Sequence, residues 1–161
     1  MADTLIAYFS WSGQSARLAE KLRDHIPGSE RYHILTKRVY AKGFFHCVVQ
    51  ARKEQKNEVL PELMNQLTGK QMLKYDRIIL IYPIWCGTCP MAVKTFLEGI
   101  RTDRLDLFPI ALSRSSGVSK SVEDIRSSAP EAAIAEGLRI QGKTADSQEA
   151  YDAVMEYLGL S

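Results

Sequence analysis

Short apolar runs alternate along this chain with segments of helical periodicity, and this alternation limits the possible folds more than any other feature. No hairpin turn separates successive strands, so each strand must return through a helix and run parallel to its neighbour. We therefore predict an α/β doubly wound fold, a three-layer sandwich with a five-stranded parallel sheet covered by helices on both faces. The expected strands cover residues 5–9, 31–35, 77–82, 107–112 and 137–140.

The predicted helices differ in how clearly the sequence marks them. A first helix should begin at Ser15 and stop at Pro27-Gly28, and another should carry Val93, Phe96, Leu97 and Ile100 at i, i+3, i+4 and i+7. A last helix is expected to open at Asp146, with Glu149 three residues on as in a capping box. Between Thr36 and Tyr75 the pattern is weak, with possible short apolar faces at 44–49 and 59–64.

Size and charge point to a single domain spanning residues 1–161. A chain of 161 residues, 45% of them hydrophobic, should bury about 70% of its unfolded surface. No apolar run reaches the ~20 residues needed to cross a bilayer, and no basic region precedes the first apolar stretch, so we expect a cytoplasmic protein. The net charge of +2 comes from mixed charges, which favours a solvated surface over a nucleic-acid or membrane partner.

The loops after the first, third and fourth strands should lie together, because parallel strands bring their carboxyl ends to one edge of the sheet. Ligands of such folds bind beyond that edge, where the strand order reverses. The first loop is rich in hydroxyl groups and leads directly into a helix, whose free N–H groups and dipole favour an anion. Its candidate binding residues are Ser10, Trp11, Ser12, Gly13, Gln14 and Ser15.

The other two loops suggest contacts to a flat ligand and to its polar edge. In the second loop, an aromatic face and the exclusion of water would suit a flat apolar ring. Its candidate residues are Pro83, Ile84, Trp85, Cys86 and Gly87. The third loop holds small residues and backbone donors but no aromatic side chain, and its candidates are Ser113, Ser115, Ser116 and Gly117.

With these loops in order along most of its length, the chain resembles the flavodoxin family. The family's phosphate loop reads (Ser/Thr)-x-Thr-Gly-Asn-Thr, and here Ser10, Ser12, Gly13, Gln14 and Ser15 fall on its positions. Its short-chain branch often carries Pro-Ile-Trp in the second loop, as this chain does. The resemblance implies strand order 2-1-3-4-5, one noncovalent FMN, and a peptide flip on flavin reduction, here at Cys86-Gly87. It further implies an electron carrier between a reductase and an acceptor protein, without catalytic residues of its own.

Two alternatives from other classes remain open. The third loop offers no aromatic residue to cover the outer flavin face. If that face is open, a nicotinamide nucleotide could reduce the flavin there and a quinone-type acceptor could reoxidise it, which would make the chain an FMN-dependent oxidoreductase. The segment from Cys86 to Cys89 also resembles the thioredoxin redox motif, which would make the chain a disulfide oxidoreductase. Next to a flavin, these two thiols could also form a disulfide that exchanges electrons with it. We expect no metal site, since the adjacent His46 and Cys47 are poorly disposed to bind one ion together.

Overall fold

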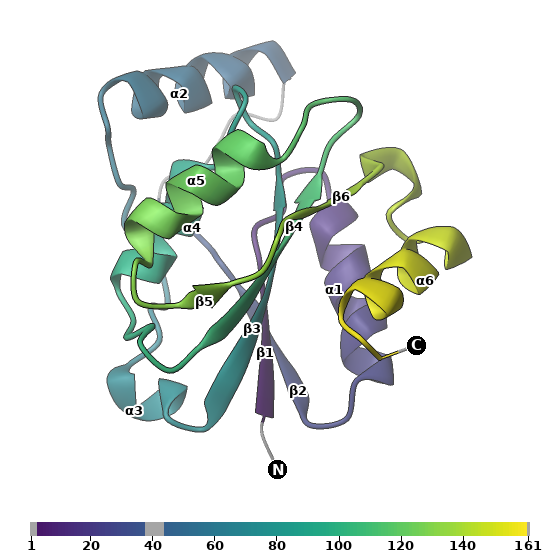
Figure 1. Cartoon of the computed structure of the whole chain (residues 1–161). Coiled ribbons are helices and arrows are strands. Elements are labelled where there is room, and N and C mark those ends of the chain that lie inside the picture. The colour runs from purple at the N-terminus through teal and green to yellow at the C-terminus, as the bar shows by residue number, and fades with distance from the viewer. Residues whose placement is uncertain (1–2, 38–43, 161) are drawn as a thin grey trace.

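The sheet is fully parallel, and its strands follow the predicted order. The computed structural model describes residues 3–37 and 44–160. The strands run in the order β2-β1-β3-β4-β5, and β6 also pairs with β4 (Figure 1). Their bounds are β1 Asp3–Tyr8, β2 Ser29–His33, β3 Tyr75–Pro83, β4 Asp106–Leu112, β5 Ala133–Ile134 and β6 Leu138–Ile140. The doubly wound fold with order 2-1-3-4-5 is thus confirmed.

The fifth strand position is split into two short pieces, whereas the sequence predicted one strand at 137–140. β5 pairs with the start of β4, and β6 pairs with its end. Between them the chain passes close under a helix, because a Cβ on Gly137 would lie 2.7 Å from Cγ2 of Val122. This position therefore needs glycine, and the strand breaks beside it.

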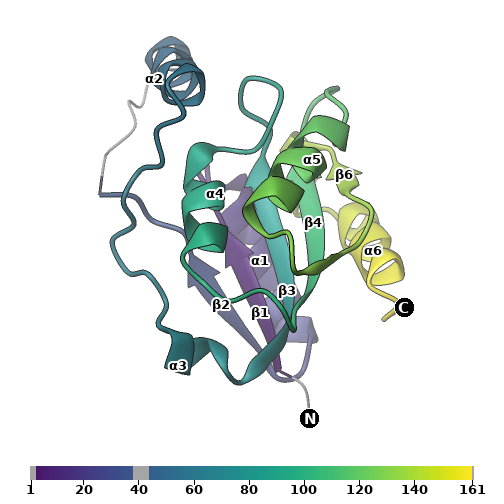
Figure 2. The same cartoon turned by 60° about the vertical axis from the view of Figure 1, so that its left-hand side comes forward.

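Helices cover both faces of the sheet, and one further helix lies beyond the carboxyl ends of its strands. α1 and α6 lie on one face, and α4 and α5 lie on the other (Figures 1 and 2). α2 lies beyond the carboxyl ends of the strands in both views, away from the two main layers. The bounds are α1 Gln14–His25, α2 Phe44–Lys56, α3 Gly69–Met72, α4 Met91–Glu98, α5 Ser119–Ser128, α6 Gln148–Tyr157 and a 3₁₀ turn η1 at Gly142–Thr144.

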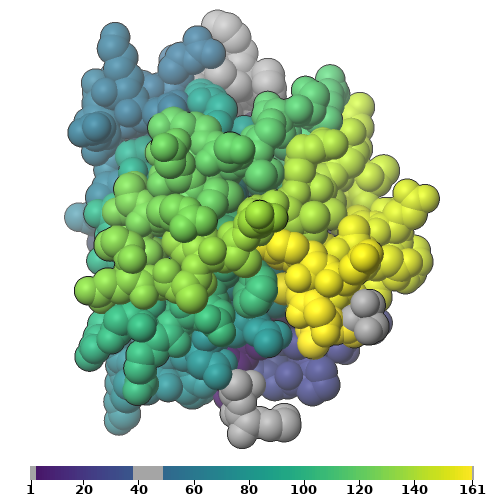
Figure 3. Space-filling model, in the orientation of Figure 1, coloured from purple at the N-terminus to yellow at the C-terminus, as the bar shows by residue number. Residues whose placement is uncertain are grey.

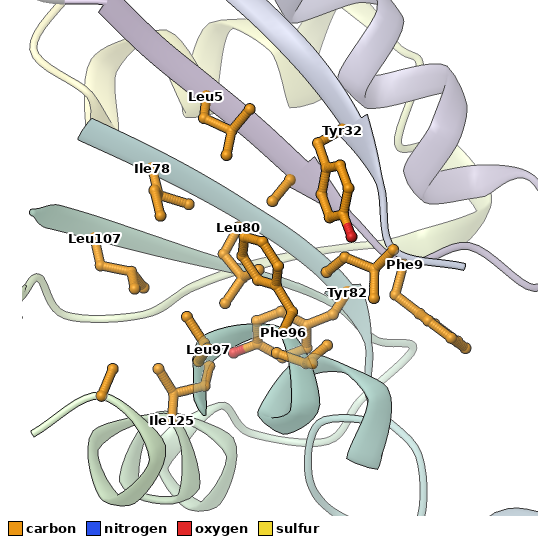
Figure 4. Close-up of a cluster of buried hydrophobic side chains, with 14 of the residues drawn as sticks. Leu5, Phe9, Tyr32, Ile78, Leu80, Tyr82, Phe96, Leu97, Leu107 and Ile125 are labelled. Carbon is orange, nitrogen blue, oxygen red and sulfur yellow. The ribbon is translucent and has the colours of Figure 1, made fainter. Parts of the chain in front are cut away.

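Each face of the sheet buries its own hydrophobic cluster. In the cluster of Figure 4, Phe96 and Leu97 of α4 and Ile125 of α5 pack on Leu80 and Leu107 of the sheet. The opposite cluster joins α1 and α6 to the other side of the same strands. In the space-filling view, α5, α6 and the chain between them cover much of the sheet (Figure 3). The central strands are therefore buried on both faces, as their continuous apolar runs predicted.

The last helix begins one residue later than expected. Its N-cap is Ser147, whose hydroxyl accepts a hydrogen bond from the backbone N–H of Ala150 at 3.1 Å. Asp146 does not cap the helix, because its carboxylate instead pairs with Arg17 of α1, Nε to Oδ2 at 3.6 Å. The predicted capping box at Asp146 and Glu149 is thus wrong.

The apolar residues at 59–64 do not form a helix face. Pro61 has no N–H to donate, and Leu63 makes an antiparallel bridge with Thr36 just beyond β2. Leu63 is buried, whereas Val59, Leu60 and Met64 are exposed. Backbone pairing along the sheet edge therefore orders this segment instead of helical packing. Among the described helices, none is long and apolar enough to cross a membrane.

Candidate functional site

A cavity of about 400 Å³ opens at the carboxyl edge of the sheet, where the predicted loops meet. This volume lies in the ~300–1,000 Å³ range of small-molecule sites. The predicted residues that line it are Trp11, Ser12, Gln14, Pro83, Ile84, Trp85, Cys86, Ser113, Ser115 and Ser116. The predicted residues that do not line it are Ser10, Gly13, Ser15, Gly87 and Gly117.

In the first loop, the residues outside the lining hold the backbone in shape. Gly13 is the N-cap of α1, and its φ of +92° is a backbone conformation that residues with a Cβ rarely adopt. Its N–H donates to Oγ of Ser10 at 3.0 Å, and the side chain of Ser15 is buried in the first turn of α1. This arrangement leaves Trp11, Ser12 and Gln14 facing the cavity at the positive end of the helix dipole.

The second loop closes as a two-residue turn. The N–H of Trp85 donates to the carbonyl of Thr88 at 2.7 Å, and the N–H of Thr88 donates back to Trp85 at 3.1 Å. Both central residues have positive φ, +52° at Cys86 and +84° at Gly87, as in a type I′ turn. Gly87 is therefore exposed at the tip of the turn, while Cys86 lines the cavity.

Contacts from neighbouring elements fix this turn on both sides. Oγ1 of the buried Thr88 donates to Oδ2 of Asp124 on α5 at 2.5 Å. The other carboxylate oxygen of Asp124 accepts from Lys120 at 3.0 Å. The ring of Phe9, at the end of β1, meets Trp85 edge-on with centroids 5.1 Å apart. The orientation of Trp85 at the cavity is thus set by residues distant in sequence.

The two cysteines of this loop are free thiols in different surroundings. Cys86 is half-buried at the cavity, whereas Cys89 is buried. Burial, and secondarily the charge of Asp124, raise the pKa of the Cys89 thiol to about 12. A thiol that stays protonated is a poor nucleophile. The sheet order excludes the thioredoxin fold. The expectation about His46 and Cys47 as metal ligands concerns side chains outside the described residues.

The third loop runs from Ser113 to Val118, because α5 begins at Ser119, and it is fastened to β6. The hydroxyl of Ser113 donates to the carbonyl of Ser116 at 2.9 Å. Nη1 of Arg139 donates to the carbonyls of Ser113 and Arg114, each at 3.2 Å. This clamp holds the loop against the cavity, where none of its lining residues is aromatic.

Sequence reasoning missed part of the lining, namely Ala51, Leu112, Arg114, Gln141, Gly142 and Lys143. The signal for Gln141 to Lys143 was present, because the loop after the fifth strand ends at the same edge of a parallel sheet. Ala51 comes from α2, in the segment whose periodicity was weak. Arg114 and Lys143 are the charged residues of the lining, and no Asp or Glu is among its described members.

Comparison with known proteins gives one family and a consistent fold. The family model described as Flavodoxin matches residues 3–156. None of the curated proteins compared with the chain matches it significantly.

Three solved structures illustrate the similarity in fold. A protein from Bacteroides eggerthii assigned as a flavoprotein is 24% identical, with TM-score 0.80 and 100% of both chains covered. One from Bacteroides uniformis with the same assignment is 24% identical, with TM-score 0.82, covering 96% of this chain and 98% of that one. A Lactobacillus acidophilus flavoprotein solved with FMN is 22% identical, with TM-score 0.71, covering 92% of this chain and 99% of that one.

Proposed function

The chain belongs to the flavodoxin family, and from this premise we propose that it binds one FMN noncovalently and carries electrons between partner proteins in the cytoplasm. The observation that carries the proposal is the cavity at the carboxyl edge of the sheet. One end of it is formed by the hydroxyl-rich loop at the N-terminus of α1, and another part by Ile84 and Trp85. The first environment suits a phosphate and the second a flat apolar ring.

The residues present fit this cofactor in chemistry as well as in size. Ser12 and Gln14 offer polar groups beside the free N–H groups of α1. Trp85, braced by Phe9, offers an aromatic surface, and the third loop offers Ser113, Ser115 and Ser116 to a polar edge. The flavin would supply the redox chemistry, and the protein would bind it, orient it and limit the access of water.

A carrier is favoured because the described lining provides little for acid–base chemistry. It contains no His, Asp or Glu, and Asp124, a carboxylate that contacts the second loop, is engaged by Thr88 and Lys120. A proton donor or acceptor for a substrate would have to be within hydrogen-bond reach. We therefore place the reductase and the acceptor on separate, as yet unidentified, protein partners.

One observation favours a second candidate, an FMN-dependent NAD(P)H:quinone-type oxidoreductase. The third loop contributes Leu112 to Ser116 to the cavity, and none of these side chains is aromatic. A flavin face left uncovered by this loop would be open to a flat second substrate.

The test is an absorption spectrum of the chain after mixing with FMN and desalting. We expect flavin bands to remain with the protein, and Gly13→Asp, which places a negative charge in the first loop, to lose them. Reduction of the bound flavin only after a reductase is added would support the carrier. Steady oxidation of NADPH by the chain alone would replace the carrier by the oxidoreductase, and no retained flavin would refute FMN binding.

A further inference from the structure

Two cationic residues from outside the first loop lie next to it: Arg17 beside Gly13, and Lys143 in the lining of the same cavity. Arg17 lies one helical turn after Gly13, and its Nη1 is 3.1 Å from the point that a Cβ on Gly13 would occupy. The guanidinium therefore extends back over the N-terminus of α1, across the backbone that begins the helix. Nε of Arg17 lies 3.6 Å from Oδ2 of Asp146. The ion pair with Asp146 therefore uses Nε, whereas Nη1 is the nitrogen that lies near Gly13.

The second cation comes from the turn after β6. Lys143 of η1 lines the same cavity as Ser12 and Gln14. The preceding Gly142 is buried against the first loop, because a Cβ there would lie 2.6 Å from Oε1 of Gln14. Since η1 and the first loop pack this closely, Lys143 is held at the same end of the site as the N-terminus of α1.

The charges around this end have a positive balance. Asp146 is the carboxylate that faces Arg17, and its backbone carbonyl also accepts from Lys21 at 3.4 Å. Arg114 adds a positive charge on the third-loop side of the cavity. With no carboxylate among the described lining residues, an anion at the first-loop end would be near Lys143 of the lining and Arg17 of α1.

We propose that Arg17 and Lys143 form a cationic pair that makes the site selective for a flavin carrying a phosphate over the same flavin without one. This inference rests on the proposed flavin-binding function. A helix N-terminus supplies about half a positive charge, whereas a phosphate monoester carries about −1.5 to −2 at pH 7. The pair supplies charge that the hydroxyls and backbone N–H groups of the first loop lack, and it acts on the phosphate only.

The experiment titrates the apoprotein, residues 1–161, with FMN and with riboflavin, following the change in flavin fluorescence. Arg17→Gln and Lys143→Gln should each weaken FMN binding about five- to tenfold and leave riboflavin binding unchanged, because a charge-assisted contact is lost. Raising the salt concentration should weaken FMN binding to the wild type more than to the double variant. Arg23→Gln, on the exposed last turn of the same helix, is the matched control and should leave both affinities unchanged.

The outcomes separate this inference from the function on which it rests. Equal losses for FMN and riboflavin would show that the two residues act through packing, and an unchanged FMN affinity in the double variant would show that they do not act at all. Either result would overturn the cationic pair while leaving flavin binding intact. A wild-type chain that binds neither flavin would refute the proposed function instead.

Discussion

Cys86 occupies a backbone conformation that suits glycine better than any residue with a Cβ. Its φ of +52° costs an L-residue about 1–2 kcal/mol relative to the right-handed region. The turn nevertheless holds this geometry, because Trp85 and Thr88 exchange two backbone hydrogen bonds and Asp124 binds the side chain of Thr88. The strain is therefore local and is balanced by contacts on either side of it.

Replacing Cys86 by glycine should thus stabilise the fold. We expect Cys86→Gly to raise the free energy of unfolding by up to about 1 kcal/mol, after the entropy that glycine adds to the unfolded chain is subtracted. Urea denaturation followed by circular dichroism measures this change. The neighbouring Gly87→Ala is the matched control, because a Cβ at φ +84° introduces the same strain and should destabilise by about 1 kcal/mol. A destabilised Cys86→Gly would mean that the thiol contributes more by packing than the backbone loses.

Among the helices and strands, those whose type and position depend on one local hydrophobic pattern were the ones that the sequence predicted best. β3 and α4 were predictable, because a buried strand and a helix face each have their own hydrophobic period. The split between β5 and β6 was not, because it depends on the closeness of Gly137 to Val122 of another element. The same holds at the site: the three loops were recognised from sequence, but Ala51 and Lys143 join them only through the tertiary fold.

α2 forms part of the wall of the cavity, and this role can be tested through Ala51. Its side chain is 7% exposed and lines the cavity, so a larger side chain would extend into the space proposed for the flavin. We expect Ala51→Phe to weaken FMN binding about tenfold or more by steric exclusion, while overpacking costs at most about 1–3 kcal/mol of stability. Val49→Phe, on the same helix at a position 50% exposed, should bind FMN like the wild type. Equal affinity for all three proteins, measured by fluorescence titration, would remove α2 from the site.

For the whole molecule, the cavity is assembled from segments that span most of the chain, from Trp11 to Lys143. Each segment is the end of a different strand or its following loop, apart from Ala51 of α2. The binding surface thus exists only when the sheet is complete, so anything that destabilises the fold lowers the concentration of competent sites. Conditions that alter global stability, such as pH, should therefore alter flavin retention as well.

His33 makes the stability of the whole molecule depend on pH in a defined window. The ring is half-buried at the end of β2 and stacks on Tyr8, with centroids 4.7 Å apart. Burial lowers its pKa below the ordinary 6.5, so the unfolded chain binds a proton more readily than the folded one. The contribution of His33 to the free energy of unfolding is therefore fully present above about pH 6.5 and is lost as the pH falls toward the lower pKa of the folded state.

Comparing unfolding by urea at about pH 7.5 and about pH 5 should isolate this contribution. His33→Phe keeps an aromatic ring against Tyr8 but cannot be protonated, so its loss of stability between the two pH values should be smaller than that of the wild type. His25→Gln, on the exposed surface of α1, should follow the wild type. Glu30 does not contribute to the difference between these two pH values. Hydrogen bonds from Lys74 and Tyr75 lower its pKa, so its contribution to stability is lost only below the ordinary pKa of 4.5. Parallel curves for His33→Phe and wild type would show that acid sensitivity in this window arises elsewhere in the molecule.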